Sequence, residues 1–174
     1  GAIRRSVFLD LGGFDEERYA RTIQDVELGY RLRRRGLDIR LDKSLQGKHL
    51  KRWTLCRMLY TDVFLRAAPW VRLLVERGGL PNDLSLDWRH RLSVLSACLI
   101  PAALVAAPFS TAGPAVAGAL AVAFAACNLR LFGFFARRYG LGFALCCLPL
   151  HLLQSLSAGV GALYGLGRLV ASPD

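Results

Sequence analysis

Long uncharged runs dominate the second half of the chain. Residues 92–109, 111–129 and 139–167 contain no Asp, Glu, Lys or Arg, and the runs are 18, 19 and 29 residues long. A helix needs about 20 apolar residues to cross the hydrocarbon core of a bilayer. The pattern therefore predicts three transmembrane helices, and the alternative is a soluble, wholly helical core.

The first half of the chain carries shorter apolar patterns. Helices are predicted over residues 6–11 and 22–35, because Gly12-Gly13 and Gly36 follow them as typical helix stops. Residues 37–42 alternate between apolar and polar side chains, which predicts a strand with one buried face. The predicted order is therefore helix, helix, strand.

A basic segment connects the two halves. Helical spacing resumes at Leu55 and continues to Trp70. Five arginines lie on or beside the same stretch: Arg52, Arg57, Arg66, Arg72 and Arg77. A basic helix beside a membrane is typical of an interfacial helix, and a solvated basic face is the alternative. We therefore expect three parts: a polar domain over 1–50, an interfacial helix with a linker over 51–91, and a membrane anchor over 92–174.

The uneven distribution of charge predicts the orientation in the membrane. The 174-residue chain has a net charge of +10, with 19 basic residues before position 92 and four after it. Arg130, Arg137 and Arg138 lie between the second and third spans, whereas the 109–114 loop has no basic residue. The positive-inside rule places residues 1–91 and 130–138 in the cytoplasm and the C-terminus outside.

Composition excludes several other classes of protein. The five cysteines form no C-x-x-C spacing, so neither a disulfide framework nor a zinc knuckle is expected. The positive charge would suit nucleic acid, but no nucleic-acid module is recognisable and much of the charge lies beside the spans. We therefore expect membrane lipids, and no nucleic acid, among the partners.

Two polar residues lie inside the third predicted span. His151 and Gln154 are candidates for function, because polar groups are costly within a bilayer. The alternative for His151 is a neutral ring bonded to a neighbouring carbonyl.

Asp25, in the polar half of the chain, has two possible roles, one structural and one catalytic. It lies three positions after Thr22, so the two side chains could form a capping box at the start of the second helix. Alternatively, a carboxylate at a helix N-terminus stays ionised and accepts a proton from a hydroxyl nucleophile. Spacing alone leaves both interpretations open.

Four ordered blocks within residues 1–91 resemble a known family. "GAIRRSVFLDLGGFDE", "QDVELGYRLRRRG" and "GKHLKRW" are similar to the C-terminal half of the catalytic domain of family 2 glycosyltransferases. "LRAAPWVRLLVERGGLPNDLSL" is similar to a stretch of bacterial membrane-attached members. The resemblance implies that residues 1–50 are the acceptor-side part of a catalytic domain with an α/β fold of the GT-A type. It also implies a nucleotide-sugar donor, a divalent metal (Mg or Mn) and inversion at the anomeric carbon.

The resemblance also implies roles for particular residues. Asp25 matches the general base that deprotonates the acceptor hydroxyl, and Gln24 stands where the family has Glu. His49 matches a metal ligand. Arg52 would face the diphosphate with Trp53, without the glutamine that the signature of processive members requires. The residues that match the acceptor side of the pocket are Gly12, Gly13, Phe14, Asp15 and Gln24.

The expected function is sugar transfer from a nucleotide-sugar donor to a hydroxyl acceptor at the cytoplasmic face of the bacterial inner membrane. An acceptor carried on a lipid would explain the anchor. The family's nucleotide-binding half and its D-x-D are not recognisable in the sequence, so we expect a C-terminal piece of an enzyme that is inactive alone. The alternative is a non-enzymatic membrane protein whose basic cytosolic segment binds anionic lipid or a partner protein.

Overall fold

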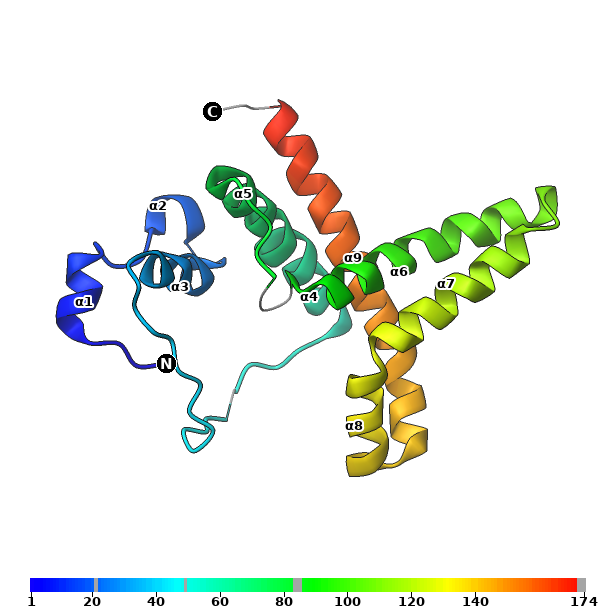
Figure 1. Cartoon of the computed structure of the whole chain (residues 1–174), viewed down its shortest axis with the longest axis horizontal. Coiled ribbons are helices and arrows are strands. Elements are labelled where there is room, and N and C mark those ends of the chain that lie inside the picture. The colour runs from blue at the N-terminus through cyan, green and yellow to red at the C-terminus, as the bar shows by residue number, and fades with distance from the viewer. Residues whose placement is uncertain (21, 49, 83–85, 172–174) are drawn as a thin grey trace.

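The computed structural model describes residues 1–20, 22–48, 50–82 and 86–171, and every regular element within these ranges is a helix (Figure 1). The N-terminal helices are α1 (Arg5–Asp10), α2 (Glu16–Tyr19) and α3 (Gln24–Arg34). The helices expected over residues 6–11 and 22–35 are therefore confirmed to within two residues. The short α2 was not expected. Asp15 starts it, because its carboxylate accepts a hydrogen bond from the backbone N–H of Arg18.

The expected α/β fold is wrong for the described residues, because residues 37–42 form no strand. Their alternating pattern favours an extended backbone locally. A strand also needs a neighbouring strand that pairs with its N–H and C=O groups. No segment in the described ranges supplies that neighbour. The side chains that should have formed a buried face are instead exposed, with Ile39 57% and Leu41 89% accessible.

The helix expected in the basic segment is present, with an irregular middle. It comprises α4 (Leu55–Tyr60), the π-helical turn η1 (Thr61–Ala67) and α5 (Ala68–Arg77), which follow one another without a break. Thr54 caps its start by accepting a hydrogen bond from the backbone N–H of Arg57. Gly78 ends it in the left-handed conformation, with φ of 68°.

Among the described residues, two helices are long and apolar enough to cross a membrane. They are Trp88–Phe109, which joins α6 (Trp88–Ala106) to the turn η3 (Ala107–Phe109), and α9 (Leu141–Ala171). They confirm the first and third expected spans in length and composition. The second expected span is not one straight helix. Its residues fall in α7 (Gly113–Cys127), which meets α8 (Leu129–Tyr139) at a bend of 64°. A third crossing therefore requires α7 and α8 to act as one broken span.

The long helix α9 organises the molecule (Figure 1). Its first half lies beside α8, and its second half packs against η1 and α5. The hairpin of α6 and α7 crosses α9 near its middle and extends away from it. Helices α1 to α3 lie on the opposite side of α5, where Tyr19, Ile23, Trp70, Leu73 and Leu74 form a small buried core.

Small residues allow α9 to approach the basic helix closely. A Cβ on Gly161 would lie 2.6 Å from the Cβ of Ala67 and 2.8 Å from the carbonyl oxygen of Val63. A Cβ on Gly165 would lie 2.9 Å from the carbonyl oxygen of Ala68. Because these atoms belong mainly to backbone, the two helices could not keep this separation with larger residues.

Candidate functional site

Asp25 lies in the first turn of α3, with an exposed side chain. Its Oδ1 accepts a hydrogen bond of 2.9 Å from the backbone N–H of Val26. The capping box does not form, because the Thr22 hydroxyl donates to the carbonyl oxygen of Tyr19 at 2.8 Å and Ile23 occupies the cap position. The positive end of the helix dipole favours a negative charge at this position. Asp25 is therefore a solvent-facing carboxylate at the N-terminal end of α3.

Arg31 fixes the glycine turn against the helix that carries Asp25. Its two terminal nitrogens donate to the carbonyl oxygens of Leu11 and Gly13, at 2.6 and 2.7 Å. Its Nε donates to the carboxylate of Glu27 at 2.8 Å, and Glu27 is only 6% exposed. The turn and α3 therefore form one unit. Helices α1 to α3 with this turn are called the polar unit below.

Glu27 and Arg31 were not identified as site residues from the sequence. The available signal was their spacing, because Glu and Arg four positions apart on a helix face one another. The sequence could not reveal that the same guanidinium also reaches a turn 18 to 20 positions earlier.

The expected acceptor-pocket residues lie in or near this unit. Gly12 and Gly13 both have positive φ, at 79° and 73°, which is the conformation that ends α1. The ring of Phe14 packs edge-on against Phe8 with 5.3 Å between centroids. Asp15 caps α2, and Gln24 is the first residue of α3. The structure gives each of them a local role. Only Gln24 adjoins Asp25 in sequence, and the glycine turn is connected to the helix of Asp25 through Arg31.

The expected diphosphate and metal residues lie elsewhere. Arg52 and Trp53 belong to the long connection between α3 and α4, which Figure 1 shows leaving the helices as an extended loop. Both side chains are exposed, and the Lys51 ammonium lies 4.1 Å above the Trp53 ring. His49 lies outside the described residues. In the described ranges no three His, Cys, Asp or Glu side chains gather to hold a metal ion, so we derive no step through a metal.

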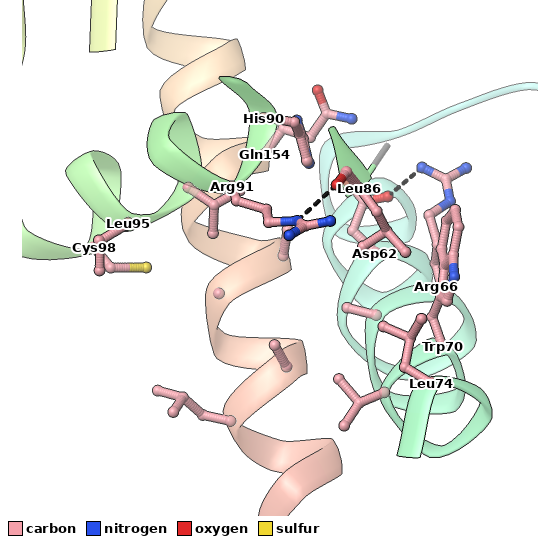
Figure 2. A pocket seen from close by; sticks show the side chains of 17 residues that line it. Asp62, Arg66, Trp70, Leu74, Leu86, His90, Arg91, Leu95, Cys98 and Gln154 are labelled. Atoms are coloured by element: carbon pink, nitrogen blue, oxygen red, sulfur yellow. Dashed lines mark hydrogen bonds and ion pairs between the residues drawn. The ribbon is translucent and has the colours of Figure 1, made fainter. Parts of the chain in front are cut away.

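A second candidate site is a cavity of about 440 Å³ between the η1–α5 helix, the start of α6 and the middle of α9 (Figure 2). Most of its wall is aliphatic. The polar and aromatic residues that line it are Asp62, Arg66, Trp70, His90, Arg91 and Gln154.

Asp62 is the most unusual member of this wall. It lies in the π-helical turn and is 5% exposed. Its Oδ1 accepts a hydrogen bond of 2.9 Å from Arg66, whereas its buried Oδ2 has no partner among the described residues. Burial raises the pKa of the Asp62 carboxyl above its ordinary value, against the opposing charge of Arg66.

Asn128 joins α6, α7 and α9 by hydrogen bonds, and His151 is its partner on α9. The Asn128 amide nitrogen donates to the Phe124 carbonyl and to the Ser93 hydroxyl, each at 2.7 Å. A carbonyl can only accept, so the amide oxygen of Asn128 faces the Nε2 of His151 at 2.7 Å, and Nε2 carries a hydrogen. The structural alternative for His151 therefore agrees with the geometry. Gln154, one turn later, lines the cavity and remains a candidate.

Within the described residues the protein is helical, and some of its helices are long enough to cross a membrane. The polar unit attached to them carries the exposed carboxylate of Asp25. No family model matches the chain, and no curated protein or solved structure matches it either. The resemblance to family 2 glycosyltransferases therefore rests on the quoted sequence blocks.

Proposed function

We propose that this chain is the acceptor-side and membrane-anchoring part of an inverting glycosyltransferase. It would act at the cytoplasmic face of a bacterial inner membrane, moving a sugar from a nucleotide-sugar donor to a hydroxyl acceptor. The observation that carries the proposal is the exposed Asp25 carboxylate at the start of α3, within the block that resembles the family. The donor and any metal come from the resemblance alone.

The role of Asp25 is that of a general base. An ionised carboxylate in solvent reach can take the proton of the acceptor hydroxyl while the hydroxyl oxygen attacks the anomeric carbon. Asp25 makes no ion pair among the described residues, so its charge is available for this step. Gln24 has no negative charge, so a single base is sufficient in this scheme.

The polar unit is held close to the candidate membrane helices, which supports a lipid-carried acceptor. The Tyr19 hydroxyl donates to Glu76 of α5 at 2.8 Å, and Arg77 lies 3.8 Å from the Glu27 carboxylate. Helix α5 in turn packs on α9. A base held in this way would meet hydroxyl groups at a constant height above the bilayer.

The test replaces Asp25 by Asn in the full-length protein that carries this sequence. Membranes containing it are incubated with labelled nucleotide sugars and extracted for labelled lipid. We expect Asp25→Asn to lower the transfer rate by about 10²–10⁴-fold, because it removes the base and keeps the shape. Asp38→Asn is the matched control, since Asp38 is an exposed carboxylate paired with Arg33 near the other end of α3.

Unchanged transfer by Asp25→Asn would refute the role of the base. The remaining candidate would then be the non-enzymatic protein whose basic segment binds anionic lipid. The geometry gives that candidate little support, because three of the five arginines of the segment pair with carboxylates of this chain. These pairs are Arg66 with Asp62, Arg72 with Glu76, and Arg77 with Glu27.

A further inference from the structure

The turn between α8 and α9, residues 137–141, carries two adjacent arginines whose charges are not compensated. Arg137 and Arg138 are exposed, and their guanidinium groups form no hydrogen bond or ion pair with any described residue. The sequence contains no Asp or Glu between Asp87 and Asp174. Helices α6 to α9 therefore supply no carboxylate that could neutralise the pair.

The arginines of the basic helix differ in this respect. Arg66 pairs with Asp62 at 2.9 Å, and Arg72 pairs with Glu76 at the same distance. A carboxylate beside a guanidinium offsets the attraction of that cation for any other anion. Beside the candidate membrane helices, an uncompensated pair of positive charges is therefore found at the α8–α9 turn.

The length of α9 relates this turn to the lipid head groups. The helix has 31 residues, so at about 1.5 Å per residue it is about 46 Å long. The hydrocarbon core of a bilayer is about 30 Å thick, so a crossing α9 extends into the head-group region at its ends. Gly140 alone separates α8 from α9, and Figure 1 shows α8 beside the first half of α9. Arg137 and Arg138 therefore lie at the level of the head groups when α9 crosses the membrane.

Aromatic rings surround the two arginines. Phe134 is 51% and Tyr139 58% exposed, and their rings meet edge-on with 6.4 Å between centroids. Phe135 packs against Phe143 of α9, with 5.6 Å between centroids. Tyrosine is enriched at membrane interfaces, where arginine side chains extend towards the phosphates and donate paired hydrogen bonds to them. Phosphate donors beside exposed apolar rings suit a phospholipid better than an acidic protein.

We propose that the α8–α9 turn binds the phosphate of an anionic phospholipid through Arg137 and Arg138, with the acyl chains along the exposed ring of Phe134. Phosphatidylglycerol, whose head group carries one negative charge, serves as the probe. Phosphatidylcholine is the reference, because its choline group would bring a further positive charge to the pair. The proposal concerns binding, and it does not depend on sugar transfer or on Asp25.

The experiment detects lipids bound to the full chain by native mass spectrometry. Protein in nonionic detergent is mixed with increasing amounts of phosphatidylglycerol or of phosphatidylcholine with the same acyl chains. We expect a first phosphatidylglycerol to be retained saturably at concentrations at which phosphatidylcholine is not retained. Glycerol 3-phosphate, which has a phosphate but no acyl chain, should not displace it.

Variants of the arginine pair link the binding to this turn. Arg137→Gln with Arg138→Gln should weaken the first binding step about tenfold or more, because two charge-assisted contacts with phosphate are lost. Lysine at both positions keeps the charges and should preserve most of the binding. Arg4→Gln with Arg5→Gln is the matched control, since it removes the same charge from an exposed pair at the start of α1 and should leave binding unchanged.

Each contrary result would overturn the proposal. Equal retention of the two lipids would exclude selection for an anionic head group, and displacement by glycerol 3-phosphate would exclude a lipid as the specific ligand. Unchanged binding in the glutamine variant would leave the pair to an acidic protein partner, and an equal loss in the Arg4 and Arg5 control would indicate a general effect of charge. Circular dichroism verifies the fold, and Arg137→Gln alone, with an intermediate loss, provides a second test.

Discussion

Glu27 stabilises the polar unit itself, and Tyr19 stabilises its attachment to α5, both more than the exposed charges around them. Glu27 is buried and bonded to Arg31, and breaking a buried ion pair by removing one partner typically costs about 3–5 kcal/mol. The hydroxyl of Tyr19 is buried beside Glu76, and burial together with this hydrogen bond raises the pKa of the Tyr19 phenol. Exposed pairs such as Arg33 with Asp38 contribute at most about 1 kcal/mol.

The pairing of Tyr19 with Glu76 predicts a pH-dependent stability. Burial alone would raise the pKa of Glu76, but hydrogen bonds from Tyr19 and Arg72 and nearby positive charges lower it below its ordinary value of 4.5. The unfolded chain therefore binds more protons in this range, so the stabilisation is present above pH 4.5 and is lost as the pH falls through the lowered pKa. Tyr19→Phe should cost about 1 kcal/mol at pH 7 and flatten this dependence.

Melting temperatures in detergent between pH 7 and pH 3 measure the effect. Tyr60→Phe is the matched control, because Tyr60 is 56% exposed and retains its ring packing on Phe64 after the change. Parallel pH profiles of Tyr19→Phe and the unaltered protein would contradict the assignment.

At the level of elements, the sequence predicted helices well and the strand wrongly. Gly13, Gly36 and Gly78 end helices through local backbone geometry, which a sequence records directly. The strand expected over 37–42 depended on a partner strand, and no sequence window contains that information. The same reason explains why Asp62 was missed: its burial results from α6 and α9, which are distant along the chain.

The structure brings only some of the expected site residues together. The glycine turn and Asp25 share one unit because Arg31 connects them, whereas Arg52 and Trp53 lie on an exposed connection whose position no local pattern determines.

The close packing of α9 on the basic helix predicts that a larger side chain on α9 destabilises the protein only where it faces that helix. Gly161→Leu should destabilise the protein by about 1–3 kcal/mol or more, because the added atoms meet Val63 and Ala67. Gly167→Leu is the control on the same helix, since a Cβ there meets nothing within 4 Å. It should be neutral or stabilise by up to about 1 kcal/mol, because leucine favours helix over glycine. Thermal melting in detergent compares them, and equal losses would contradict the close approach.

At the scale of the whole molecule, the bend between α7 and α8 decides the topology. If only α6 and α9 crossed the membrane, Arg130, Arg137 and Arg138 would lie on the outer side, against the positive-inside rule. If α7 and α8 together make a third crossing, Arg137 and Arg138 lie at its cytoplasmic end, and Arg130 lies within the span beside the bend. The side chain of Asn128 at the bend is hydrogen-bonded to Ser93 and His151. Such bonds to neighbouring helices make a break in a membrane helix tolerable.

The three-span arrangement predicts the location of fused reporters. Alkaline phosphatase, which is active only outside the cytoplasm, should be inactive after Arg138 and active at the C-terminus. A green fluorescent protein fused at the same points should give the reverse pattern. An inactive phosphatase at the C-terminus would instead indicate a re-entrant α7–α8 pair and two crossings.

The π-helical turn has a consequence for how this chain can change during evolution. Each residue of a helix advances the chain by about 100° and 1.5 Å, and Thr61–Ala67 separates α4 from the face of α5 that holds the polar unit. Loss of one residue here would change the register between α4 and α5, so either α4 turns or Trp70 and Leu73 move relative to Tyr19. The segment should therefore tolerate substitution at exposed positions such as Phe64 far better than any change in length.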